Sequence, residues 1–87
     1  MDTIYKALAD PTRRRILDIL KKGSRNAGEI GAEFQMTGAS VSHHLSLLKA
    51  AGLVGSEKKG QQVIYTLDTT VLQDLMIWIS DLKGGNK

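Results

Sequence analysis

The sequence predicts a mainly α-helical fold with one small β-hairpin. Apolar residues recur at the helical spacing of three and four in several stretches, and capping residues stand at the boundaries of most of them. Two short β-prone runs, 53–54 and 63–67, lie on either side of Glu57-Lys58-Lys59-Gly60, which is typical of a hairpin. The chain has 87 residues, so we expect a single small domain over 1–87.

A capping carboxylate and a proline mark the start of the second helix. Asp10 can accept hydrogen bonds from free N–H groups, and Pro11 suits the first helical position. We expect this helix over 12–22, ended by Gly23. A short first helix precedes it and carries three apolar residues on one face: Ile4, Tyr5 and Leu8.

Two more helices follow, joined by a short turn. Asn26 can cap the third helix, and Thr37 can cap a fourth helix over 38–51, which Gly52 ends in the left-handed conformation. Two helices joined by three or four residues form the helix-turn-helix pattern, in which the second helix is the recognition helix. The sequence therefore predicts a recognition helix over 38–51.

A hairpin and a last helix complete the order of elements. The hairpin is expected over 53–67 with a basic tip, and Gly60 supplies the positive φ of a tight turn. Asp68 or Thr69 can cap the last helix, expected over 69–83. The predicted fold is a winged helix-turn-helix, in the order of four helices, two strands and a fifth helix.

The recognition helix has one apolar and one polar face. Val41, Leu45 and Leu48 form the buried stripe. The N-terminal turns of such helices reach base edges in DNA, and small or hydroxyl side chains allow close approach. Four residues lie opposite or beside the stripe in these turns: Ala39, Ser42, His43 and Ser46.

The adjacent histidines do not predict a metal site. Neighbouring side chains on a helix point about 100° apart, whereas helical metal sites use residues four apart. His44 lies nearer the buried stripe, and we expect it to pack there or to donate an N–H hydrogen bond.

Positive charge is concentrated in the middle of the chain. The formal net charge is +3, but residues 11–60 alone carry +5, and no carboxylate occurs from Phe34 to Ser56. A surface that approaches phosphates avoids acids in this way. Of Arg13, Arg14 and Arg15, at least one is expected to pair with an acid such as Asp10 or Asp18. The predicted phosphate and minor-groove contacts are polar or basic: Arg25, Lys49, Lys58, Lys59 and Gln61.

The last helix is more apolar than a surface helix of a small monomer should be. Trp78 cannot share one narrow stripe with Leu72, Met76 and Ile77, so the helix has two apolar faces. One face can cover the domain's own core, and the other needs a partner. A two-fold dimer meets that need and sets two recognition helices about 34 Å apart.

Several classes of protein are disfavoured. The chain has no cysteine, which excludes disulfides and thiolate metal sites, and no Gly-rich phosphate loop or acid-paired histidine indicates an enzyme. No apolar run reaches the ~20 residues of a membrane span, so we expect a cytoplasmic protein. A winged-helix module that binds proteins and not DNA stays the alternative.

Three segments carry a resemblance to a known family. The runs "LADPTRRRILDIL", "GASVSHHLSLLKAAGLV" and "KKGQQVIYTL" resemble ArsR-type winged-helix repressors over about residues 4–67. The closing "DTTVLQDLMIWISDL" resembles in particular the sporulation-delaying autorepressor branch. The resemblance implies a homodimer that binds a palindromic DNA operator and represses transcription.

The resemblance also assigns residues. Gly38 departs from the polar residue often found there, and this removes one base contact. The implied base-contacting residues are Ala39, Ser40, Ser42, His43 and Ser46. Joining through the first and last helices places the dimer interface at Ile4, Tyr5, Leu8, Leu72, Leu75, Trp78, Ile79 and Leu82.

Metal sensing by the family's familiar sites is not expected. Those sites use cysteines at the start of the third helix, or histidines and acids on the last helix. Here "AGEIGAEF" has no cysteine and "LQDLMIWISDLK" has no histidine, which leaves only Asp74 and Asp81. We therefore expect no metal, no cofactor and no small-molecule substrate, while a protein partner that sequesters the repressor stays open.

Overall fold

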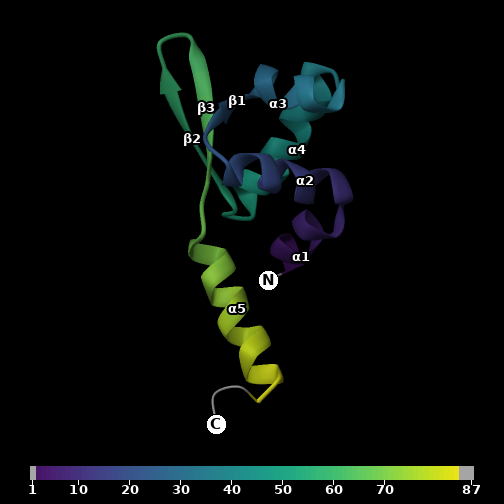
Figure 1. Cartoon of the computed structure of the whole chain (residues 1–87), viewed down its shortest axis with the longest axis vertical. Helices are drawn as coiled ribbons and strands as arrows, with labels where there is room; N and C mark the ends of the chain where they lie inside the picture. The colour runs from purple at the N-terminus through teal and green to yellow at the C-terminus, as the bar shows by residue number, and fades with distance from the viewer. Residues whose placement is uncertain (1, 85–87) are drawn as a thin grey trace.

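The computed structural model describes residues 2–84 and has the elements of the predicted fold (Figure 1). In chain order they are α1 Asp2–Ala9, α2 Pro11–Lys21, β1 Arg25–Asn26, α3 Ala27–Phe34, α4 Gly38–Ala50, β2 Val54–Lys59, β3 Gln62–Leu67 and α5 Thr70–Leu82. The predicted class, mainly α with a small β-hairpin in a winged helix-turn-helix, is confirmed.

The β structure is larger than the predicted hairpin. β3 pairs with both β2 and β1, so the antiparallel sheet has the order β1-β3-β2. The extra strand pairs Arg25 with Tyr65 and Asn26 with Ile64. Two residues cannot show a period-two pattern, and only the neighbouring strand makes this segment extended.

The hairpin turn is also tighter than predicted. Glu57, Lys58 and Lys59 belong to β2 and not to the turn, because Lys59 pairs with Gln62 across the sheet. The reversal is left to two residues, and Gly60 adopts the expected positive φ of 61°.

Helix starts follow the capping chemistry. The Oδ2 atom of Asp10 accepts from the backbone N–H of Arg13 at 3.0 Å, and Thr37 Oγ1 accepts from Ser40 at 3.2 Å. Asn26 and Glu29 form a reciprocal capping box on α3. At α5 the N-cap position is Thr69, whose side chain makes no capping bond, and Asp68 Oδ1 instead accepts from the N–H of Thr70 at 3.0 Å.

Helix ends show one expected and one unexpected cap. Gly52 takes the left-handed conformation after α4, with φ of 78°, as predicted. Gln35 takes the same conformation after α3, with φ of 56°, although it carries a Cβ.

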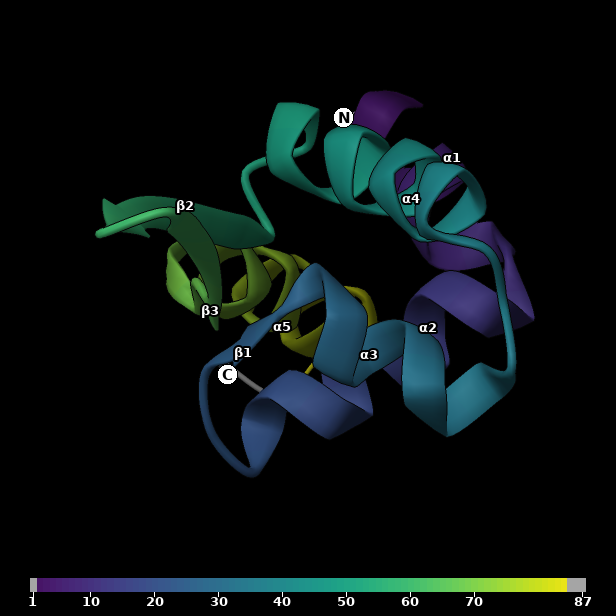
Figure 2. The same ribbon diagram turned by 90° about the horizontal axis from the view of Figure 1, so that it is seen from above.

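The core lies where α1 to α4 meet the base of the hairpin. Figure 2 shows the hairpin extending to one side of α2, α3 and α4. The predicted stripe of α4 is almost fully buried, and no buried side chain among residues 2–84 is charged or polar. The buried apolar residues are Ala7, Ile16, Leu20, Ile30, Val41, Leu45, Leu48, Ala51, Leu53 and Val54.

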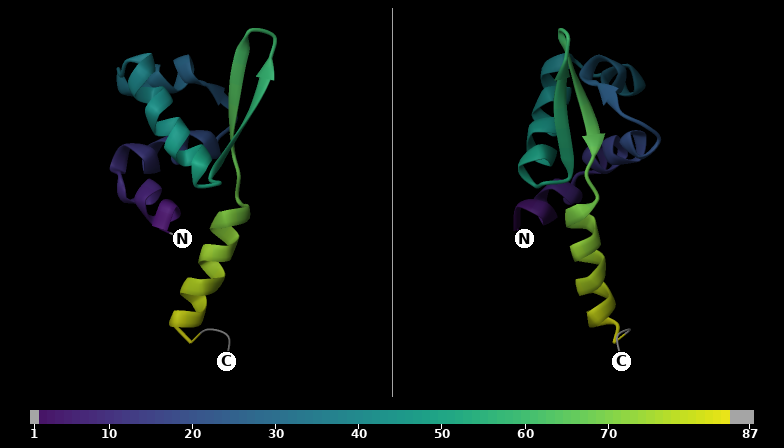
Figure 3. Two further views of the ribbon diagram at one scale, coloured as in Figure 1. Left: turned by 180° about the vertical axis from the view of Figure 1, so that it is seen from behind. Right: turned by 90° about the vertical axis from the view of Figure 1, so that its left-hand side faces the viewer.

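Helix α5 projects away from this core. It has no buried residue, and it makes the molecule elongated, with extents of 49 × 23 × 21 Å (Figures 1 and 3). Only Val71 and Leu72, in its first turn, pack against the core, while Trp78 meets Tyr5 of α1 with ring centroids 6.2 Å apart. Within residues 2–84, no helix is long and apolar enough to span a bilayer.

Candidate nucleic-acid interface

The exposed face of α4 is polar and uncharged in its first two turns. Ala39, Ser42, His43 and Ser46 are exposed, whereas Ser40 is half-buried and its N–H is used in the Thr37 cap. Free N–H groups at the start of the helix add a positive dipole end. This face can approach nucleic acid closely and offer short hydrogen-bonding side chains.

Close packing against α3 holds α4 in place. A Cβ at Gly31 would lie 3.3 Å from Cγ2 of Val41, which is tighter than most real contacts. Gly31 is buried, so the two helices of the helix-turn-helix approach each other through a position without a side chain. By contrast, nothing lies within 4 Å of a Cβ at Gly38, on the outer end of α4.

The hairpin carries the second part of the surface. Lys58, Lys59 and Gln61 are exposed at its tip, where Lys59 Nζ lies 3.6 Å from a carboxylate oxygen of Glu57. Lys49 joins the two parts, because its Nζ donates to Ser56 Oγ of β2 at 2.6 Å. The basic residue at the end of α4 is therefore fixed against the base of the hairpin.

The tip of the hairpin and the N-terminal end of α4 lie at the same end of the molecule. Figure 3 shows both at the end opposite to the C-terminal part of α5. The predicted base-contacting and wing residues are thus brought to one end, although they stand up to 22 positions apart in the chain.

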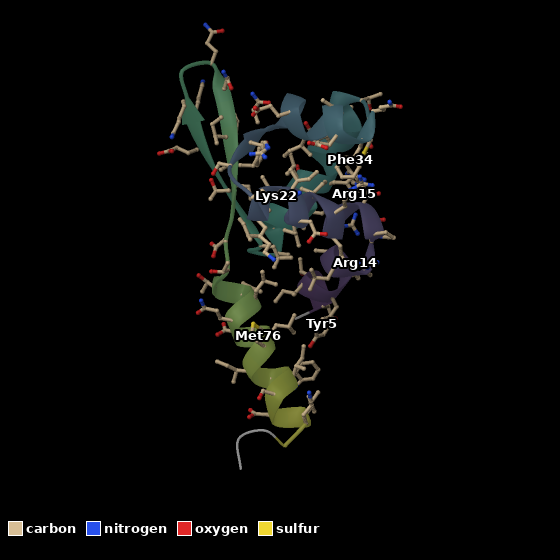
Figure 4. The ribbon with its side chains drawn as sticks, in the orientation of Figure 1. Tyr5, Arg14, Arg15, Lys22, Phe34 and Met76 are labelled. Atoms are coloured by element: carbon tan, nitrogen blue, oxygen red, sulfur yellow. The ribbon has the colours of Figure 1, made fainter. Side chains whose placement is uncertain are left out.

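Arg25 lies on β1, which pairs with β3 of the hairpin. Its Nη1 donates to the carbonyl of Ser24 at 3.3 Å, and its side chain faces a small cleft between α2 and α3. The cleft is also lined by Arg15, Asp18, Ile19, Lys22 and Glu33. Figure 4 places Arg15 beside Phe34, over whose ring its guanidinium lies at 5.3 Å.

The arginine cluster has a different role from the predicted one. Within residues 2–84, no ion pair joins these side chains to Asp10 or Asp18, although the positive charge of Arg13 contributes to lowering the pKa of Asp10. Arg14 Nη1 donates to the carbonyls of Leu8 and Ala9 at 2.7 and 3.0 Å. Such carbonyls at the end of α1 have no partner within the helix. A guanidinium has several N–H donors and no acceptor, so it can satisfy them.

Arg13 reaches farther and contacts the recognition helix. Besides two α1 carbonyls, its Nη1 lies 3.2 Å from Nδ1 of His44, which is in turn 3.9 Å from Oδ2 of Asp10. His44 packs as predicted, with only 16% of its side chain exposed, but its Nδ1 accepts this bond and does not donate. The sequence offered no sign of this contact, which joins residues 31 positions apart.

Asp10 is held in its charged form. The N–H of Arg13 that donates to its carboxylate lowers the pKa of Asp10 below its ordinary value, against a smaller opposing effect of desolvation. The pKa of Asp68 is lowered in the same way by the N–H of Thr70.

The predicted dimer residues fall into two groups. Ile4, Leu8 and Leu72 pack against the domain's own core, and Leu75 is half-buried. The others are exposed, and two residues outside the prediction are more exposed than most of them: Met76 at 68% and Ile77 at 58%. The exposed large apolar residues of α1 and α5, which we call the α5 face, are Tyr5, Met76, Ile77, Trp78, Ile79 and Leu82.

Comparison with known proteins agrees with this arrangement. Residues 10–56 match the model of the bacterial regulatory protein, arsR family. The transcriptional repressor SdpR of Bacillus subtilis is 47% identical over 99% of this chain and 98% of its own length. The arsenical resistance operon repressor of Staphylococcus aureus is 34% identical over 100% of this chain and 84% of its own length.

A solved structure shows the same fold. The homodimeric winged helix-turn-helix DNA-binding domain of Mb0332 from Mycobacterium bovis superposes with a TM-score of 0.77 and 27% identity, covering 98% of this chain and 79% of that one. Together with the matched family model and the repressors above, this likeness agrees with the winged helix-turn-helix fold of this chain. The chain therefore belongs to the arsR family of bacterial regulatory proteins, and it is a transcriptional repressor with a winged helix-turn-helix DNA-binding domain and not an enzyme.

Proposed function

We propose that the chain acts as a homodimer that binds an inverted-repeat operator and blocks transcription from the promoter it overlaps. The observation that carries this proposal is the uncharged face of α4, which lies at the same end of the molecule as the basic hairpin tip. In this arrangement α4 enters the major groove, where Ser42, His43 and Ser46 meet base edges. Lys58 and Lys59 meet phosphates or the minor groove.

The proposed DNA surface includes the predicted residues that the fold brings together. Ala39 allows close approach of the helix, and Lys49 and Gln61 extend the polar rim. Ser40 contributes through its side chain only at the edge, because it is half-buried. We leave Arg25 out of this surface, since its guanidinium faces the cleft between α2 and α3.

The dimer in this proposal forms through α1 and α5. Helix α5 has no buried residue, and its apolar side chains would stay in water in a monomer. Pairing two α5 faces across a two-fold axis removes them from water and completes the small core. The similar Mb0332 domain, described as homodimeric, supports the formation of a dimer.

We propose further that this repressor works in the cytoplasm and does not respond to a transition metal through α3 or α5. The chain has no cysteine, and neither helix carries a histidine. Adding Zn²⁺ at a few equivalents should leave operator affinity unchanged, and release of DNA by the metal would contradict this part of the proposal.

The test is a fluorescence-anisotropy titration with two duplexes of equal length at two salt concentrations. One duplex comes from just upstream of the chain's own gene, and the other has the same bases scrambled. A preference for the upstream duplex of about 10³-fold or more is expected for a specific autorepressor. Equal, salt-sensitive binding to both duplexes would contradict autoregulation, and no binding at low salt would favour a protein-binding module.

Single substitutions locate the surface. His43→Ala should reduce the preference for the upstream duplex by roughly tenfold, because a lost base contact costs about 1–3 kcal/mol. Unchanged affinity and unchanged preference would show that α4 does not read the groove in the proposed way.

A further inference from the structure

We propose that Arg13 and His44 are positioning residues for DNA binding, linking α1 to the recognition helix α4. This inference rests on the proposed function, in which α4 reads DNA and α1 borders the dimer interface. Neither side chain needs to touch DNA. Their contacts set the position from which Ser42 and His43 approach the groove.

Arg13 is anchored on α1 by two hydrogen bonds. Its Nε donates to the carbonyl of Ala7 at 3.0 Å, and its Nη2 donates to the carbonyl of Lys6 at 2.9 Å. The guanidinium is planar and rigid. Once its Nε and Nη2 donors are bound to α1, the direction of the third donor, Nη1, is fixed as well. The guanidinium is therefore oriented by α1 before it meets any other element.

The third donor of Arg13 faces His44. The distance from Nη1 to Nδ1 is 3.2 Å, and a guanidinium has no acceptor, so Nδ1 must accept. This contact requires a neutral imidazole with its proton on Nε2. With only 16% of its side chain exposed, the ring has little freedom to turn away.

His44 lies on α4 between the exposed face and the buried face of the helix. The residue before it, His43, is on the exposed face, and the residue after it, Leu45, is buried in the core. A change in the His44 ring therefore bears directly on the turn of helix that faces DNA. At the other end of the link, Tyr5 of α1 meets Trp78 of α5. The contacts form one continuous chain from the α5 face through α1, Arg13 and His44 to the DNA-facing side of α4.

Protonation would change this link. The ionisable groups facing His44 are Arg13 from α2, Asp10 from the α1–α2 junction, and His43 on its own helix, whose ring centroid lies 5.9 Å from that of His44. A proton on Nδ1 removes the acceptor and places two cations together, while Asp10 Oδ2, 3.9 Å away, attracts the charged ring. A proton on Nδ1 would therefore break the bond from Arg13 and favour the contact with Asp10 Oδ2.

A matched pair of arginine variants tests the link. Arg13→Met and Arg14→Met each remove one positive charge and two contacts with α1 carbonyls, but only Arg13 reaches His44. Arg13→Met should lower the preference for the upstream duplex by roughly tenfold more than Arg14→Met does. Equal effects of the two variants would overturn the proposal. Circular dichroism and sedimentation identify a variant that is unfolded or monomeric.

Two His44 variants supply a rescue. His44→Asn keeps an oxygen acceptor near the place of Nδ1 and carries no proton, whereas His44→Leu keeps bulk without an acceptor. Asn should retain most of the preference, and Leu should lose it. Equal loss of the preference with Asn and with Leu would contradict the positioning role.

A measurement without DNA separates this inference from the proposed function. The ¹⁵N chemical shifts of the His44 ring at pH 8 should show an unprotonated Nδ1, and Arg13→Met should shift both these signals and the amides of residues 42–46. Arg14→Met should leave them in place. If the wild type bound no DNA specifically but showed these shifts, the proposed function would fail while the link stood. A protonated Nδ1 would refute the link itself.

Discussion

Single residues in this chain act mainly by satisfying backbone groups at helix ends. Asp10, Thr37 and Asp68 accept N–H groups at the starts of helices, and Arg13 and Arg14 donate to carbonyls at the end of α1. In a domain this small, each helix end is a large share of the structure, so these contacts matter for stability.

Replacing Asp10 with asparagine should make the stability of the folded protein depend less on pH in the acidic range. Its pKa is lowered in the folded protein, chiefly by the N–H of Arg13, so its carboxylate stabilises the fold above its unfolded pKa. That stabilisation is lost as the pH falls through the lowered folded pKa. Asp10→Asn keeps a capping oxygen without a titrating group. The difference in Tm between the two proteins should therefore shrink from pH 6 to pH 3. A constant difference would exclude this role.

Replacing Gln35 with glycine should stabilise the protein. Gln35 has a φ of 56° at the end of α3, a conformation that costs a residue with a Cβ about 1 kcal/mol more than glycine. Gln35→Gly is expected to raise the free energy of unfolding by about 0.5–1 kcal/mol in a urea titration. Gln35→Ala is the control, since it shortens the side chain but keeps the Cβ, and a similar gain with alanine would show that backbone strain is not the cause.

At the scale of elements, separate contacts hold the recognition helix α4 and the hairpin in place. The contact between Gly31 and Val41 sets α4 against α3, and the bond from Lys49 to Ser56 sets the hairpin against α4. A further bond from Asn26 Nδ2 to Gln62 Oε1, at 2.7 Å, holds β3 against the start of α3. The recognition helix and the hairpin are therefore placed by different contacts and can be tested separately.

The hairpin tip should contribute affinity without sequence preference. Replacing both Lys58 and Lys59 with alanine removes two exposed positive charges and leaves the buried base of the hairpin intact. Binding to the upstream and the scrambled duplex should weaken by similar factors, and the slope of log affinity against log salt should fall by about 1–2. A selective loss on the upstream duplex would instead assign base readout to the hairpin. Lys21→Ala, on α2, is the matched charge control.

The whole molecule is elongated, because α5 projects from the body and its apolar residues are not covered within a single chain. Helix α5 projects from the body and exposes its apolar residues, while the tip of the hairpin and the start of α4 lie at the other end (Figures 1 and 3). This separation allows two subunits to join at one end and to bind DNA at the other. It also explains why a domain of 87 residues can leave most of a helix outside its own core.

A charge in the α5 face should prevent dimer formation without unfolding the monomer. Met76 is 68% exposed in the single chain and lies on α5 below the body of the molecule in Figure 4, so Met76→Lys removes no contact within the core. Sedimentation equilibrium should show dimers weakened by at least tenfold, because a buried charge without a partner is costly. Met76→Leu, which keeps an apolar side chain, should remain dimeric. A dimeric Met76→Lys protein would place the interface elsewhere.

Local chemistry made most of the fold predictable, and the candidate site only in part. Capping residues and apolar spacing predicted the helices, and the alternation around Gly60 predicted the hairpin. The polar face of α4 could also be predicted, because a helix places residues on faces by their spacing alone. The strand at Arg25 and Asn26 could not, since it depends on a partner strand about 40 positions away in the chain.

The sequence by itself determined the helices, their caps, the hairpin and the face that α4 turns outward, because these depend on residues within a few positions of one another. Only the tertiary structure decided which apolar residues of α1 and α5 serve the chain's own core and which stay exposed. It alone brought Arg13 to His44, across 31 positions. Such contacts depend on the relative placement of whole helices, which results from packing of the complete core and leaves no periodic pattern in the chain.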